Sequence, residues 1–212
     1  MTVPPIFTEA AGRDNITFTV PLVSGRQVKV EAVAEPMCLG ADTVALLAAG
    51  DHAIFPLLTP RGMVSWQIAR PKQQDIATLC ERWALAAGLG EYGFGRLVHI
   101  LRHTDLVEAD LQRFYNIDLS GWPRGEITTR RVVCLVSGLW HEHSSLFWSE
   151  LADRDPLTKE ATVLAQLASA PGDPHPFLVS REIRRQKAED DAKIARMRAR
   201  GLSGLPPPSE EV

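Results

Sequence analysis

The chain has 212 residues, which is enough for one well-formed core or two small ones. Its apolar content of 45% and charged content of 23% are typical of a globular protein and exclude a disordered one. A net charge of -3 argues against binding by bulk electrostatics to nucleic acid, so we expect no nucleic-acid partner.

The cysteines and the length of the apolar runs indicate in which cellular compartment the protein is found. Cys38, Cys80 and Cys134 are odd in number, far apart and set in apolar runs, as is typical of small buried side chains in a reducing compartment. The N-terminus lacks a basic start followed by an apolar segment, so we expect no signal peptide. Apolar runs stay below the roughly 18 residues that span a bilayer. We therefore expect a soluble cytoplasmic protein without a membrane partner.

A β-hairpin is predicted near the N-terminus. Apolar and polar residues alternate in 16–20 and again in 27–34. Ser24 and Gly25 supply a turn between the two runs. This pattern predicts two paired strands with one buried face.

The next segments are a helix and two candidate strands. Residues 42–49 are predicted to be helical, ended by Gly50. The apolar segments 53–58 and 63–69 are separated by Thr59-Pro60-Arg61-Gly62, a sequence typical of turns. We interpret these segments as two further strands of the sheet.

From residue 71 onward the apolar residues recur with helical spacing, so we expect a helical body. The predicted helices are 71–87, 91–103, 104–115, 128–139, 144–152 and 156–168. In the last of these, an apolar stripe aligns Leu157, Ala161, Leu164 and Ala168.

The end of the chain is different in composition. Residues 171–176 form a Pro-rich linker, and Ser180 can cap a helix over 181–200 that holds eight Lys or Arg and four Asp or Glu. A helix this polar gains little by packing on its own domain, so we expect a mobile arm that contacts a partner. The alternative is a solvated tail. Residues 202–212 are expected to be disordered.

Together these patterns predict an α+β fold, mainly α. A small N-terminal β-hairpin or sheet packs on a multi-helix body that carries a charged C-terminal helical arm. The expected parts are a β-rich part over 1–70, the helical body over 71–170, and the linker, arm and tail over 171–212.

Catalytic patterns are not recognisable. His99 and His103 have the spacing of metal ligands on a helix, but Ile100 stands where a zinc protease has Glu. His141 and His143 would face the same way in a strand, yet they fall between two predicted helices, so we expect a polar loop. We predict a protein that is not an enzyme and needs no cofactor. A small metal hydrolase that uses His141 and His143 is one alternative.

The second half of the chain carries an ordered set of features. An aromatic pair ends a helix, an Ile-Asp-Leu triplet and a Trp-containing loop follow, and an Arg-led apolar helix and a second Trp complete the set. These features are Phe114, Tyr115, Ile117-Asp118-Leu119, Trp122, Thr129-Arg130-Arg131 and Trp148. Over residues 105–200 the set resembles the tail assembly chaperones of long-tailed, siphovirus-type phages that infect actinobacteria.

This resemblance implies a non-enzymatic chaperone that binds the long, aggregation-prone tape measure protein during tail assembly, in the cytoplasm of the host bacterium. It leaves open a contact with the tail tube protein and self-association. A structural virion protein, such as a minor tail or head–tail connector subunit, is the alternative function. The candidate partner-binding residues are Phe114, Tyr115, Trp122, Arg130, Arg131, Trp148, Arg184, Arg185, Lys187 and Lys193.

Overall fold

The computed structural model describes residues 15–172 and 174–199. The chain divides into two compact units on either side of the bond between His141 and Glu142. The fold is α+β, mainly α, as predicted. The predicted β-rich part and most of the predicted helical body share the first unit, because the hairpin packs directly on the helices. The predicted disordered tail over 202–212 lies outside the described residues.

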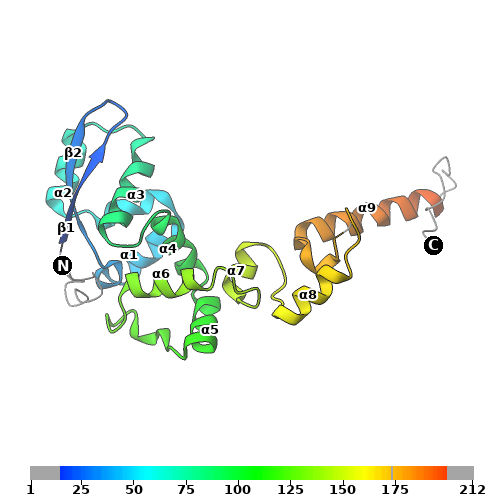
Figure 1. Ribbon diagram of the computed structural model, residues 1–212. Helices are drawn as coiled ribbons and strands as arrows, with labels where there is room; N and C mark the ends of the chain where they lie inside the picture. The colour runs from blue at the N-terminus through cyan, green and yellow to red at the C-terminus, as the bar shows by residue number, and fades with distance from the viewer. Residues whose placement is uncertain (1–14, 173, 200–212) are drawn as a thin grey trace. The chain divides into compact units, whose positions relative to one another are not determined.

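The predicted hairpin is confirmed. Strand β1 (Asn15–Pro21) pairs antiparallel with β2 (Gln27–Val33), and the register sets Phe18 opposite Val30. Alternate residues of both strands are buried, as a sheet with one covered face requires. Helix α3 contacts β1 and helix α2 contacts β2 (Figure 1).

The prediction of two further strands is wrong. Residues 51–57 form the 3-10 helix η3 (Asp51–Leu57), and α2 (Pro60–Ile68) replaces the second strand. The Thr59 hydroxyl caps α2 by accepting a 3.1 Å hydrogen bond from the N–H of Gly62, and Pro60 occupies the first helical turn. The same four residues that are typical of a turn also begin a helix. An isolated antiparallel bridge also joins Ala32 of β2 to Leu58.

Gly62 lets α2 approach the sheet closely. A Cβ atom at this position would lie 1.9 Å from the carbonyl oxygen of Glu31 on β2. Backbone atoms cannot move out of the way as a flexible side chain can, so this glycine is required by the packing of α2 on β2.

Further helices complete the first unit. They are α1 (Ala41–Ala49), α3 (Asp75–Ala86), α4 (Gly93–Arg102), α5 (Thr104–Tyr115) and α6 (Thr129–Gly138), with the 3-10 turns η2 (Pro36–Leu39) and η4 (Leu119–Gly121). Trp83 on α3 lies in the core, where it meets the ring of Phe94 edge to face at 5.8 Å between centroids. Its indole N–H donates a 2.9 Å hydrogen bond to the carbonyl of Val33, so this side chain joins the helices to the hairpin.

A buried carboxylate ties the hairpin turn to α3. Asp75, the first residue of α3, accepts hydrogen bonds from the backbone N–H groups of Val23, at 2.7 Å, and Lys72, at 2.6 Å. Negative charge is favourable at a helix N-terminus, where backbone N–H groups lack helical partners. The loop at the open end of the hairpin is thereby fixed to the body.

The cysteine prediction is correct for one residue of three. Cys80 is buried on α3, but Cys38 and Cys134 are exposed. Cys134 follows Val132 and Val133, which are both buried on α6, and the helical turn carries the next position outward. An apolar run in sequence therefore did not mark a buried face here.

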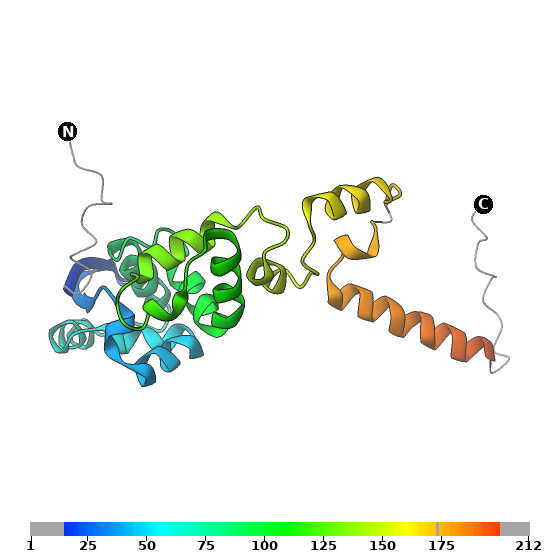
Figure 2. The same cartoon turned by 90° about the horizontal axis from the view of Figure 1, so that it is seen from below.

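The second unit is smaller. It contains α7 (Leu146–Leu151), α8 (Lys159–Leu167), the 3-10 turn η5 (Pro176–Leu178) and α9 (Arg181–Ala199). Figure 2 shows α9 as a straight helix whose C-terminal half extends away from α8. Among the described residues, helices long and apolar enough to cross a bilayer are absent.

Candidate functional site

Trp122, a predicted partner contact, is instead a core residue. Its side chain is 1% exposed, and its indole N–H donates a 2.9 Å hydrogen bond to the hydroxyl oxygen of Thr129. The hydroxyl of Thr129 donates in turn to the carboxylate of Glu35, which also accepts a 2.8 Å bond from the Thr129 backbone N–H. Glu35 thus caps the first turn of α6 from a position 94 residues earlier in the chain.

The aromatic pair at the end of α5 is partly covered. The ring of Phe114 is half-buried, and the guanidinium carbon of Arg113 lies 5.1 Å from its centroid, within the range of a cation–π contact. Tyr115 is exposed, but its hydroxyl donates a 3.3 Å hydrogen bond to the carbonyl of Leu135 on α6. A Cβ atom at Gly138 would lie 2.9 Å from that hydroxyl oxygen. Tyr115 therefore links α5 to α6.

The two arginines at the start of α6 differ in exposure. Arg130 is half-buried, and its side chain passes over Gly88, where an added Cβ would lie 3.1 Å from its Cδ. Arg131 is exposed. In the first unit, Tyr115 and Arg131 are therefore the predicted partner contacts that face solvent, while Trp122 does not.

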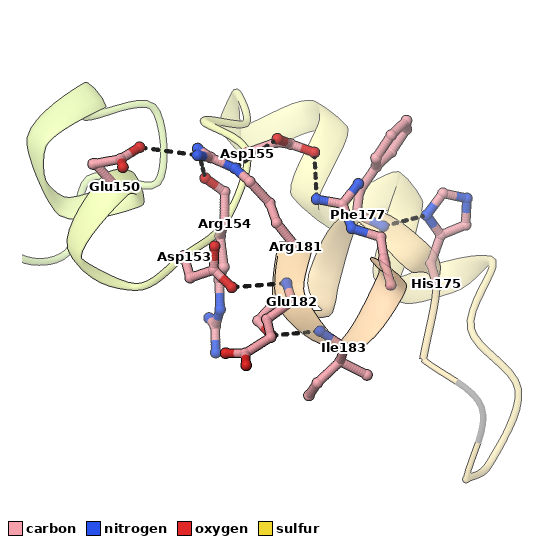
Figure 3. Close-up of polar contacts among 11 residues, drawn as sticks. Glu150, Asp153, Arg154, Asp155, His175, Phe177, Arg181, Glu182 and Ile183 are labelled. Carbon is pink, nitrogen blue, oxygen red and sulfur yellow. Dashed lines mark hydrogen bonds and ion pairs between the residues drawn. The ribbon is translucent and has the colours of Figure 1, made fainter. Parts of the chain in front are cut away.

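In the second unit, the first turn of α9 is held by three acidic side chains. We call this cluster the arm anchor, and its members are Glu150, Asp153, Asp155, Arg181 and Arg184. The guanidinium of Arg181 bonds to Glu150 at 2.9 Å and to Asp155 at 3.2 Å, and that of Arg184 bonds to the second oxygen of Asp155 at 2.7 Å (Figure 3). Two arginines one turn apart on the helix thus share one carboxylate.

Backbone contacts complete the arm anchor. The carboxylate of Asp153 accepts a 2.9 Å hydrogen bond from the N–H of Glu182, and the carbonyl of Asp153 accepts one from the N–H of Arg181 at 2.7 Å. The hydroxyl of Ser180 accepts from the N–H of Ile183 at 3.3 Å, which confirms the predicted cap. The N–H groups of Arg181 and Glu182 are therefore satisfied by Asp153 in the loop that follows α7, and that of Ile183 by Ser180.

The charges of the arm anchor shift one another's proton affinity. Hydrogen bonding to Arg184, together with the positive charges of Arg184 and Arg181, lowers the pKa of Asp155 below its ordinary value, although partial burial opposes the shift. The hydrogen bond to Glu150 raises the pKa of Arg181. Both groups are therefore charged throughout the neutral range.

The expectation that the whole arm is free of its own domain is wrong for the first turn of α9. Ionic contacts, rather than an apolar core, hold it. Beyond the first turn the side chains are different: Arg185 and Lys187 are exposed, and Lys193 pairs with Asp190 of the same helix at 3.1 Å. The predicted partner contact Arg184 belongs to the arm anchor, whereas Arg185, Lys187 and Lys193 project into solvent.

Helix α8 presents an apolar face to solvent. The predicted stripe led us to expect Leu164 inside, but Leu164 is 66% exposed and Leu167 is 78% exposed. The helix instead buries Thr162 and Ala165. Val163, also exposed, lies on the same side as the two leucines because positions three and four apart share a helix face. We call Val163, Leu164 and Leu167 the α8 apolar face.

The other aromatic and histidine candidates lie apart from one another. Trp148 is half-buried and packs edge to face on Phe147, with 5.1 Å between the ring centroids. His141 and His143 are exposed in the predicted loop. Burial, followed by the charges of Arg102 and His103, lowers the pKa of His99. Within 15–172 and 174–199, clusters of three His, Cys, Asp or Glu placed to hold a metal ion are absent.

Sequence reasoning missed the arm anchor and the α8 apolar face. The anchor has a readable signal, because acids at 150, 153 and 155 precede arginines at 181 and 184 that lie one turn apart. The sequence signal for the α8 apolar face is weaker. Val163, Leu164 and Leu167 form a second apolar stripe beside the predicted one, and either stripe could be the buried side.

Comparison of the chain with family models, with curated proteins and with solved structures yields no match.

Proposed function

We propose that the protein is a non-enzymatic tail assembly chaperone of a long-tailed phage, and that its client is the tape measure protein. The observation that carries this proposal is the α8 apolar face, which exposes three large aliphatic side chains in the same unit as the charged helix α9. Large apolar side chains that lie together on a surface are typical of a binding site for another protein.

The proposed client has a matching surface. A tape measure protein is a long helix with an apolar stripe, which has to be covered until the tail is built around it. The α8 apolar face can pack against such a stripe in the manner of helix-to-helix recognition. Phe177 on the 3-10 turn η5 contributes further exposed apolar surface in this unit, because η5 contacts α8.

The exposed charges of α9 give the client a second contact. Residues 181–200 hold eight basic and four acidic side chains, and the charged side chains from Arg185 to Arg196 are exposed. Since the arm anchor fixes the start of the helix, these charges project from a defined base rather than from a free tail. Charges of this kind speed encounter and select partners more than they add affinity.

Co-expression with the tape measure protein tests the proposal. The wild-type chain should keep the client soluble and co-purify with it, whereas L164E/L167E should lose both effects because it places charge on the α8 apolar face. Ile68→Glu is the matched control, since Ile68 is equally exposed on α2 of the first unit. An insoluble client in the presence of the wild-type chain, or equal capture by L164E/L167E, would contradict the proposal.

Mass spectrometry of purified phage particles separates this function from a structural one. An assembly chaperone should be absent from finished particles, since it leaves before they are complete. A structural tail or connector subunit would be found there in a fixed ratio to the other tail proteins.

A further inference from the structure

Helix α9 carries an apolar stripe on the side that the arm anchor does not use. Ile183 is 57% exposed and Met197 is 41% exposed, and Ile194 is half-buried between them. In Figure 3 the side chain of Ile183 points away from the carboxylate of Asp155. The stripe and the anchored side therefore lie on different faces of the helix.

The stripe has coiled-coil spacing. Ile183, Lys187, Asp190, Ile194 and Met197 are separated by four, three, four and three residues, which is the alternation of core positions in a heptad repeat. Two of these five core positions are charged, one with each sign. All five positions lie on one side of the helix, so a second helix packed along this side would meet both the apolar and the charged side chains.

The order of the charges selects one way of pairing. In a parallel pair of identical helices, Lys187 would face Lys187 and Asp190 would face Asp190, and both layers would be repulsive. In an antiparallel pair centred between positions 188 and 189, Lys187 faces Asp190 twice, and Ile183 faces Ile194 twice. The sequence of α9 is thus complementary to itself in the antiparallel direction.

We propose that two copies of this chain associate through α9 as an antiparallel coiled coil with a twofold axis between Ala188 and Glu189. The two apolar layers of Ile183 against Ile194 flank two ionic layers of Lys187 against Asp190. This geometry gives a closed, isologous contact in which the same surface of both copies is used. The proposal does not depend on the identity of the client.

One contact within the chain competes with this pairing. The carboxylate of Asp190 is 3.1 Å from the ammonium of Lys193, but the side chains are 57% and 66% exposed. Ion pairs this exposed contribute little and are readily exchanged. Asp190 can therefore turn to Lys187 of a second copy without a large loss, and Lys193 remains solvated at the edge of the contact.

The contact is short, so the association is weak. Helix α9 has 19 residues and a length of roughly 28 Å, which offers four full core layers. That is less than a standard-size interface buries, and we expect a dissociation constant of about 10–1000 µM. The ionic layers lie near solvent, so added salt should weaken the dimer.

Sedimentation equilibrium of the full chain at low ionic strength tests the proposal with variants in which the charges at positions 187 and 190 are reversed or swapped. The wild-type chain should form a dimer with increasing concentration. Lys187→Asp alone and Asp190→Lys alone should each be monomeric, because each creates two repulsive layers. K187D/D190K should dimerise again, and an equimolar mixture of the two single variants should form a heterodimer.

Arg185→Asp is the matched control, because it makes the same change of charge as K187D on a side of α9 away from the stripe, and it should still dimerise. Far-UV circular dichroism checks that each variant keeps α9 helical. If K187D loses helix, D190K is an independent test of the same ionic layers. A wild-type chain that stays monomeric at about 1 mM, dimers that persist in both single variants, or a double variant that remains monomeric would each overturn the proposal.

Discussion

The indole N–H of Trp122 donates a 2.9 Å hydrogen bond to the hydroxyl oxygen of Thr129 inside the first unit. The hydroxyl of Thr129 in turn donates a hydrogen bond to the carboxylate of Glu35, so these three polar side chains satisfy one another in the core. The loop that contains Trp122 and the start of α6 are thereby held together.

Trp122→Phe should lower the free energy of unfolding of the first unit by about 1–3 kcal/mol, because it removes the N–H donor and leaves a small gap. Urea unfolding followed by circular dichroism measures the change. Trp140→Phe is the control: Trp140 is 62% exposed, and its change should stay within about 0.5 kcal/mol. Unchanged stability in Trp122→Phe, with lost client binding, would restore the earlier interpretation of Trp122 as a partner contact.

Glu35 and Thr129 should be energetically coupled. Glu35→Gln and Thr129→Val should each destabilise the first unit by about 1–3 kcal/mol, because each leaves a buried polar group without its partner. The double variant should cost less than the sum, with a coupling of about 0.5–3 kcal/mol in a double-mutant cycle. Glu108→Gln, on the exposed side of α5, controls for loss of one carboxylate. Additive effects would show that the two contacts act independently.

Local patterns predicted the local structure. The period-two alternation around Val20 and Val30 is sufficient for the hairpin, because neighbouring positions in a strand face opposite sides. The contact of Glu35 with Thr129 joins positions 94 residues apart, and no periodicity in either segment indicates it. The burial of Trp122 could not be predicted for the same reason, since its partner lies on another element.

Ambiguous local signals account for the remaining errors. Thr59 and Pro60 are equally good residues for a turn and for a helix start, and the close packing of Gly62 on β2 is a tertiary contact that the local sequence does not indicate. On α8, Leu164 belongs to one possible apolar stripe and to another with Leu167, and the small residue Ala165 takes the buried side. Amphipathicity alone does not rank two stripes of similar strength.

Asp155→Asn should loosen the first turn of α9. The change removes the negative charge that Arg181 and Arg184 share, so amide hydrogen exchange over the first turn should become about three- to tenfold faster. Hydrogen exchange with mass spectrometry measures this rate. Asp191→Asn, an exposed position further along the same helix, should leave the first turn unchanged. Equal protection in Asp155→Asn and wild type would mean that the backbone contacts of Asp153 suffice.

The arm anchor should respond to acid and not to mildly acidic pH. The pKa of Asp155 is lowered in the folded protein, so its contribution to stability is complete above the ordinary value of 3.8 and is lost as pH falls through the lowered value. The side-chain NMR signals of Arg184, which pairs with Asp155, should therefore be constant between about pH 7 and pH 5 and change only below about pH 4. Asp155→Asn should lack this transition. A change near neutral pH would point to a different group.

The exposed charges of α9, rather than those in the arm anchor, should govern the encounter with the client. Arg185→Gln, Lys193→Gln and Arg196→Gln together remove three exposed charges from the arm without touching the anchor or Lys187, which the proposed self-association uses. We expect about tenfold weaker client binding at low salt and a smaller loss at high salt, because exposed charges act through screened electrostatics.

The matched control for this triple variant neutralises Arg26, Arg61 and Lys72, three exposed cations of the first unit, and has the same net charge. It should bind the client as the wild type does. Fluorescence anisotropy with a labelled segment of the proposed client, the tape measure protein, at a protein concentration below that of self-association, measures both affinities. If the two triple variants lose affinity equally, net charge and not the arm attracts the client. If neither loses affinity at low salt, α9 beyond its first turn is a solvated helix, and the α8 apolar face has to supply the binding energy.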